Sequence, residues 1–141
     1  MGRIIAGVVA GILAAFAAVY AVELIGRFFY PAANVDVSDI EQLKAMMATM
    51  TIGAKLFVAG AWFVGAFAGG LVAALIVRRP WAAWTPAIVV ALAALANILV
   101  MPHPAWMQVS AFVLPLLGGL LARRLVPMRD VADDEPADVA A

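Results

Sequence analysis

The sequence contains no cysteine and a single histidine in 141 residues. The lack of cysteine excludes disulfides, thiolate metal sites and a cysteine nucleophile. One histidine cannot build a multi-histidine metal or haem site. The chain also lacks the G-x-S-x-G, H-E-x-x-H and phosphate-binding glycine motifs that mark common catalytic sites. We therefore expect no enzyme, no cofactor and no metal, and assign no catalytic residue.

Charge is also scarce, because only 13% of the residues are charged while 67% are hydrophobic, with a mean hydropathy of +1.05. Nine basic residues balance nine acidic ones, so no net field favours binding to nucleic acid. A water-soluble chain of this length could not cover so much apolar surface with polar groups. The lipid bilayer is therefore the expected solvent and partner.

Four long apolar runs account for most of the chain. A helix needs roughly 20 residues to cross about 30 Å of hydrocarbon. Pro102 and Pro104 separate the last two runs, because proline lacks a backbone donor and disfavours helix before it. Residues 1–129 are therefore expected to form an all-α integral membrane protein, an antiparallel bundle of four transmembrane helices at about 4–26, 55–78, 82–101 and 105–123.

The lysines and arginines indicate the orientation of these spans, because basic residues accumulate at cytoplasmic ends. Six of them flank one set of span ends, namely Arg3, Arg78, Arg79, Arg123, Arg124 and Arg129. Only Arg27, Lys44 and Lys55 lie on the other side. Both termini are therefore predicted to be cytoplasmic, in a bacterial inner membrane if the source is bacterial.

Two segments are expected outside the lipid. Between the first two spans, Ser38 and Glu41 form a capping-box pattern, and apolar residues then recur at helical spacing at Ile40, Leu43, Met47 and Met50. This pattern predicts a short amphipathic helix on the periplasmic surface, either a lid on the bundle or a docking surface. Residues 130–141 carry five acidic residues without periodicity and are predicted to be a disordered cytoplasmic tail.

Small residues recur on one face of several spans. Helices in lipid associate largely through close packing of such residues, since burial of apolar surface gives no net gain there. The predicted packing positions are Gly7, Gly11, Ala61, Gly65, Gly69 and Gly119. They favour tight packing within the chain. The alternative is that one face, with the second span as the first candidate, forms a homo-oligomer or docks onto a larger membrane complex.

Polar side chains at membrane depth need partners and are therefore candidate functional residues. Glu23, Asn97, His103 and Gln108 are all expected near the outer third of the membrane, and Trp62 either lines a pocket there or fills the core. We take these five residues as a candidate ligand-binding site. Structural alternatives exist: Glu23 can pair with Arg27 one turn away, Asn97 can bond Gln108, and His103 can be an exposed turn residue.

Two strings, ELIGRFFYP at 23–31 and MPHPAW at 101–106, resemble those of small, uncharacterised four-span proteins of bacterial inner membranes. The resemblance implies the architecture and the location but no activity. The leading hypothesis is a non-enzymatic accessory or structural subunit that acts through helix packing. The alternative is a small transporter or a lipid- or ligand-binding protein with a polar pocket on the outer side.

Overall fold

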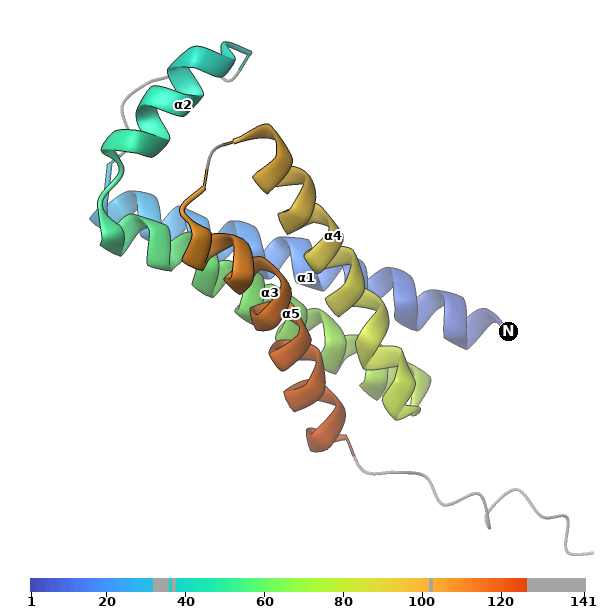
Figure 1. Ribbon diagram of the computed structural model, residues 1–141. Coiled ribbons are helices and arrows are strands. Elements are labelled where there is room, and N and C mark those ends of the chain that lie inside the picture. Colours follow the sequence, from blue (N-terminus) through green and yellow to red (C-terminus); the bar gives the residue numbers. More distant parts are fainter. Residues whose placement is uncertain (32–35, 37, 102, 127–141) are drawn as a thin grey trace, which may run out of the picture.

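The computed structural model describes residues 1–31, 36, 38–101 and 103–126, so the predicted tail lies outside the described residues. All regular structure in these ranges is helical (Figure 1). Four segments are long and apolar enough to cross a membrane, which indicates a multi-pass membrane protein. They are α1 (Gly2–Phe29), α3 (Ile52–Val77), the 3-10 turn η1 (Pro80–Ala83) continued by α4 (Trp84–Val100), and α5 (Ala105–Leu125).

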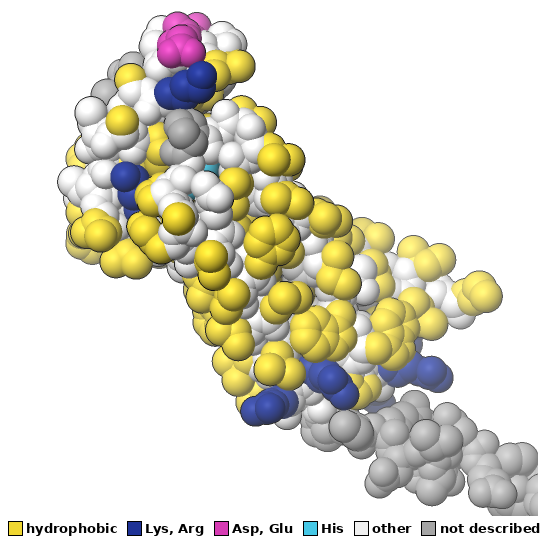
Figure 2. Space-filling view, in the orientation of Figure 1, with side chains coloured by type: hydrophobic (Ala, Val, Ile, Leu, Met, Phe, Trp, Pro, Cys, Tyr) yellow, Lys and Arg dark blue, Asp and Glu magenta, His cyan; other side chains and the backbone are white. Residues whose placement is uncertain are grey.

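The surface of these helices is covered with large apolar side chains, whereas lysine and arginine side chains gather towards the two ends (Figure 2). Leu13 is 65% exposed and Leu99 is 79% exposed, and many other large apolar side chains of these helices are also exposed. In water such continuous apolar surface would promote aggregation. In hydrocarbon it carries no penalty, which agrees with the lengths of the four helices.

Helix α3 is the central element. Half of its most apolar 18-residue window is buried, whereas the corresponding fraction for α1 is 17%. Helix α3 packs along α1 and α5 and also contacts α4. Helix α1 has its main contact with α3 and a smaller one with α4. One face of α1 is therefore covered, and most of its remaining surface is exposed.

Helices α1 and α3 touch through backbone atoms at two glycines. A Cβ added to Gly11 would lie 2.8 Å from the carbonyl oxygen of Gly69, and one added to Gly69 would lie 2.5 Å from the carbonyl oxygen of Gly11. Pro86 of α4 is 3.0 Å from both added positions. Three helices therefore meet at this point, and only glycine leaves enough space for the two backbones.

The other predicted packing positions also lie in contacts within the chain. A Cβ on Gly7 would be 2.5 Å from Val77, and one on Gly119 would be 2.6 Å from Ala87. Gly65 faces Val19 of α1, and Ala61 is fully buried. Gly65 and Gly69, on the face of the second span that was a candidate for homo-oligomer contacts, thus pack against α1 of the same chain.

Helix α2 (Ile40–Thr49) lies beyond the N-terminal end of α3, at the end of the molecule where α4 and α5 are joined (Figure 1). Its residues Leu43 and Met47 are buried, whereas Ile40 is 52% exposed. The predicted capping box is wrong, because the helix is capped by Asp39 and not by Ser38. A carboxylate is favoured there by its full negative charge at the positive end of the helix dipole.

The Asp39 carboxylate holds the first turn of α2 through several donors. Its Oδ1 accepts from the backbone nitrogens of Glu41 at 2.9 Å and Gln42 at 3.3 Å, and its Oδ2 accepts from Nε2 of Gln42 at 2.8 Å. Led by the Gln42 side chain, these hydrogen bonds hold the pKa of Asp39 below its ordinary value of 3.8. Ser38 instead donates its hydroxyl to Asp36 Oδ1 at 2.6 Å.

Candidate functional site at His103

His103 lies between α4 and α5 and is only 6% exposed. Its Nδ1 is 2.8 Å from the carbonyl oxygen of Met101. This contact requires the proton on Nδ1, so that in the neutral ring Nε2 presents an acceptor lone pair. Nε2 is buried, and among the described residues it has no hydrogen-bond partner. A buried polar atom without a partner is costly and therefore marks this position as unusual.

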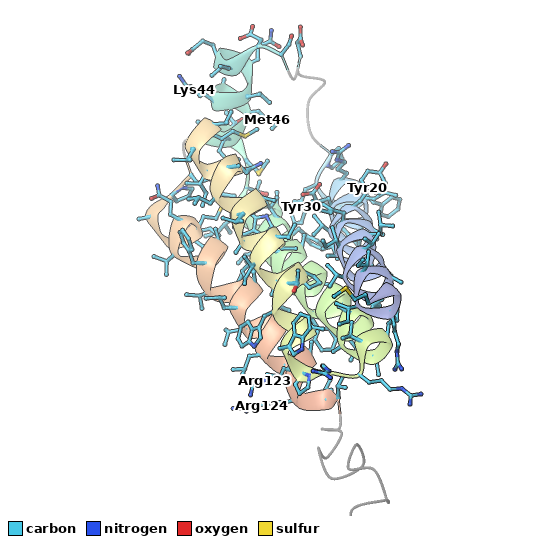
Figure 3. All side chains as sticks on the ribbon, turned by 90° about the vertical axis from the view of Figure 1, so that its right-hand side faces the viewer. Tyr20, Tyr30, Lys44, Met46, Arg123 and Arg124 are labelled. Carbon is cyan, nitrogen blue, oxygen red and sulfur yellow. The ribbon has the colours of Figure 1, made fainter. Side chains whose placement is uncertain are left out.

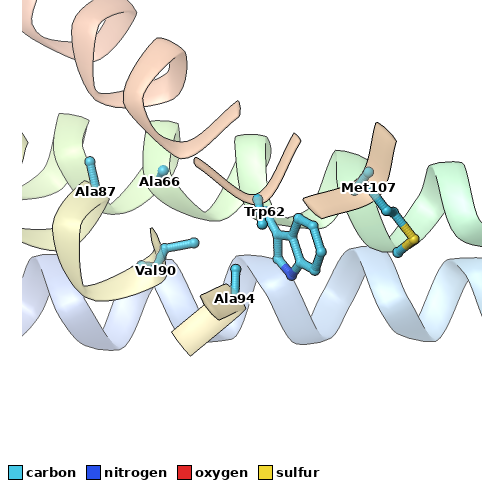
Figure 4. Packing of buried hydrophobic residues seen from close by; sticks show 9 residues of the cluster. Trp62, Ala66, Ala87, Val90, Ala94 and Met107 are labelled. Carbon is cyan, nitrogen blue, oxygen red and sulfur yellow. The ribbon is translucent and has the colours of Figure 1, made fainter. Parts of the chain in front are cut away.

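The ring of His103 packs against Trp62 of α3, with 6.4 Å between ring centroids and 50° between their planes. Trp62 is 6% exposed and belongs to the largest buried cluster, together with Met107 of α5 and small residues of α3 and α4 (Figure 4). Gln108 donates from Nε2 to the carbonyl oxygen of His103 at 2.9 Å. The connection between α4 and α5 is therefore held down onto α3, and His103 is not the exposed turn residue that its flanking prolines suggest.

The other two predicted polar residues do not join this group. Asn97 is exposed, and Gln108 bonds the backbone of His103 and not the Asn97 side chain. Glu23 is half-buried, and within the described part of the chain it has no ion pair within 4.0 Å, either with Arg27 or with Lys55. No hydrogen bond joins Glu23 or Asn97 to His103 across the described ranges. The structure thus brings together His103, Gln108 and Trp62.

The chemistry available at His103 is narrow. Nε2 can accept one hydrogen bond from a hydroxyl, an ammonium or a water molecule. A metal centre needs several ligands, and the described residues contain no group of three or more histidine, cysteine, aspartate or glutamate side chains that could hold an ion. What the described residues offer at this position is therefore a single hydrogen-bond acceptor, the Nε2 of His103.

A second polar group lies where the end of α3 meets the start of α1. Arg3, near the start of α1, donates from Nε to the carbonyl oxygen of Ile76 in the last turn of α3 at 2.7 Å. Arg78 adopts a left-handed conformation with φ of 57° directly after that helix. The signal available in the sequence was the position of these arginines at span ends, but their grouping depends on which helices pack together.

No model of a known protein family, no curated protein and no solved structure matches this chain. The resemblance of residues 23–31 and 101–106 to small four-span proteins therefore stays a hypothesis.

Proposed function

We propose that this chain is a non-enzymatic accessory subunit of a bacterial inner-membrane complex. In this proposal the four long helices form an antiparallel bundle with both termini in the cytoplasm and α2 at the periplasmic surface. The observation that supports it best is the asymmetry of α1. Its glycine face is covered by α3, whereas its opposite face, with Ile5, Leu13 and Tyr20 each more than 60% exposed, is covered by nothing within the described residues.

The outer third of α1 carries three polar side chains, of which Tyr20 and Arg27 are exposed and Glu23 is half-buried. Tyr20 points away from the other helices (Figure 3), Glu23 has no ion pair among the described residues, and Arg27 is exposed. At about 1.5 Å per residue, Arg3 and Glu23 are roughly 30 Å apart along the helix, close to the thickness of hydrocarbon. Glu23 and Arg27 then lie at the outer boundary, and the Tyr20 hydroxyl lies just below it. A partner helix with polar groups at this depth would satisfy all three side chains.

Site-specific crosslinking tests this proposal in the native membrane. A photoreactive amino acid at Tyr20 should give one discrete crosslinked product. The same probe at Phe112 of α5, which is also an exposed aromatic position at 46%, serves as the control and should give none. Native mass spectrometry of gently extracted protein should then show a stoichiometric partner of the same mass. A lone chain with no product at Tyr20 would contradict the proposal.

The proposed orientation has its own test, because the chain has no cysteine of its own. Single cysteines can be introduced at Gly2, where an added Cβ meets nothing within 4 Å, and at the exposed Ser38. In intact cells a membrane-impermeant maleimide should label Ser38→Cys and leave Gly2→Cys unlabelled. The reverse pattern would show that the orientation inferred from the arginines is wrong.

A second candidate function is binding of a hydrogen-bond donor on the outer side, and the buried, unpartnered Nε2 of His103 favours it. Phosphatidylethanolamine is a suitable probe, since its ammonium group can donate to that nitrogen and lie against Trp62. Added lipid should raise the melting temperature of the wild-type protein but not that of His103→Phe. An equal response of the two proteins would exclude His103 as the binding residue.

A further inference from the structure

Five arginines lie at the end of the molecule opposite α2. They are Arg3 at the start of α1, Arg78 and Arg79 after α3, and Arg123 and Arg124 at the end of α5. All five are exposed, and none forms an ion pair in the part of the chain that the structure describes. The acidic residues of that part belong to the outer third of α1 or to the region of α2, namely Glu23, Asp36, Asp39 and Glu41. We call the five arginines the arginine end; Arg123 and Arg124 are labelled in Figure 3.

Alanine packing brings the two arginine pairs together. Ala74 of α3, Ala83 of η1 and Ala122 of α5 are fully buried in one cluster. A Cβ added to Gly70 of α3 would lie 3.1 Å from the Cβ of Ala122 and 2.9 Å from the carbonyl oxygen of Ala83. Because Arg123 follows Ala122 directly, the end of α5 is fixed beside the turn that carries the Arg78–Arg79 pair.

One further contact and one exposed aromatic side chain define this surface. The hydrogen bond from Arg3 to Ile76 connects α1 to the last turn of α3. Arg3 therefore lies close to the Arg78–Arg79 pair, which follows that turn. Trp81 follows Arg79 by two residues and is 46% exposed. Arginine together with an exposed tryptophan at the end of apolar helices is typical of the level of lipid headgroups.

We propose that the arginine end is a binding site for an anionic phospholipid, specifically one with two phosphates in its headgroup, such as diphosphatidylglycerol (cardiolipin). Guanidinium groups bind phosphate oxygens in a bidentate manner, and within the described ranges no carboxylate pairs with these arginines. The two arginine pairs lie on neighbouring helix ends, and each pair can bind one phosphate. When both phosphates belong to one lipid molecule, binding of the first raises the effective concentration of the second. The proposal rests on the proposed orientation only for the leaflet in which the lipid is found.

The experiment is a lipid titration of the full-length protein in detergent, read by native mass spectrometry, with cardiolipin, phosphatidylglycerol and phosphatidylethanolamine as probes. Cardiolipin should bind with one-to-one stoichiometry and more tightly than the other two lipids. Each arginine near an anionic surface contributes about a fivefold change in binding, so Arg78→Gln with Arg79→Gln should weaken cardiolipin binding about 30-fold. The control removes the same charge from the other end, with Arg27→Gln and Lys55→Gln, and should leave binding within about twofold.

Other outcomes would overturn the proposal. Equal losses in the double variant and its control would mean that cardiolipin responds to net charge alone. The native chain could also fail to bind cardiolipin and do so only after the acidic residues of 130–141 are changed to their amides. That result would mean that the arginine end binds this acidic segment and not a lipid. Because the titration needs neither a protein partner nor an oriented membrane, its failure would leave the proposed subunit function untouched, and the crosslinking result at Tyr20 would leave the lipid site untouched.

Discussion

Replacing Gly69 with alanine should destabilise the protein by forcing α1 and α3 apart. The new methyl carbon would lie 2.5 Å from the carbonyl oxygen of Gly11 and 2.6 Å from the Cβ of Ala15. These two contacts would have to lengthen by roughly 0.8 to 0.9 Å to reach ordinary van der Waals contact at 3.4 Å. Overpacking of this kind costs about 1–3 kcal/mol. Pro86 limits the movement, because it is 3.0 Å from the same added carbon.

Gly60→Ala is the matched control, since it makes the same change in the same helix. An added Cβ at Gly60 meets nothing within 4 Å. Any gain in helix propensity, about 0.5–1 kcal/mol in water, is common to both variants and cancels in their difference. The free energies of unfolding should therefore differ by about 1–3 kcal/mol, with Gly60→Ala equal to or above the wild type. Reversible unfolding in mixed micelles of dodecyl sulfate, followed by tryptophan fluorescence, measures this difference.

A compensating substitution sharpens the result. Ala15→Gly removes one of the three atoms that the new methyl group meets, while the Gly11 carbonyl oxygen and Pro86 remain. The double variant should recover part of the loss and not all of it, giving a coupling energy of about 0.5–1.5 kcal/mol between the two positions. Equal stability of Gly69→Ala and Gly60→Ala would refute the close contact of α1 with α3 and the reasoning built on it.

Three further predictions follow from individual side chains. The pKa of Asp39 is lowered in the folded chain, so its contribution to the stability of α2 should be fully present above pH 3.8, its ordinary pKa, and should be lost as the pH falls through the lowered pKa. Amide exchange in α2 should become faster over this pH range. Asp39→Asn should abolish the pH dependence. His103→Phe removes the costly unpartnered Nε2 but also the hydrogen bond from Nδ1 to Met101, so the free energy of unfolding should stay within about 1 kcal/mol of wild type. A loss above the roughly 1.5 kcal/mol that one hydrogen bond contributes, measured by chemical unfolding, would mean that Nε2 has a partner. Arg3→Gln breaks the hydrogen bond to Ile76 and should speed amide exchange in the first turns of α1 but not of α5; unchanged exchange would show that this bond does not hold α1.

The all-helical fold follows from length and hydropathy alone, because each apolar run is long enough to cross hydrocarbon and the backbone must satisfy its own hydrogen bonds there. The details at the polar ends were harder to predict. Ser38 with Glu41 matches a capping box, yet Asp39 competes for the same backbone donors and wins as the stronger, charged acceptor. The local pattern could not show this, since both residues are good caps.

The candidate site was predictable only in part, for a reason that concerns tertiary contacts. A histidine between two prolines has the composition of an exposed turn, and its burial depends on Trp62, which is about 40 residues away in sequence. Asn97 differs from its prediction in the opposite direction, because its side chain is exposed. Its place near the end of α4 suggested convergence with His103, but convergence depends on the rotation of the helix, and the side chain is exposed. Periodicity gives the faces of a helix and not the neighbour that each face will meet.

The contact between Gly11 and Gly69 has a consequence for biosynthesis. About 60 residues separate the two glycines, so at roughly 5–20 residues per second the ribosome needs roughly 3–12 s to deliver the partner of α1. During that time α1 resides in the bilayer as a solitary helix, with its glycine face against lipid. Any other nascent helix that offers small residues competes for this face in the meantime. The order of translation therefore sets a window in which α1 can be captured by the wrong neighbour, and this window closes when α3 arrives.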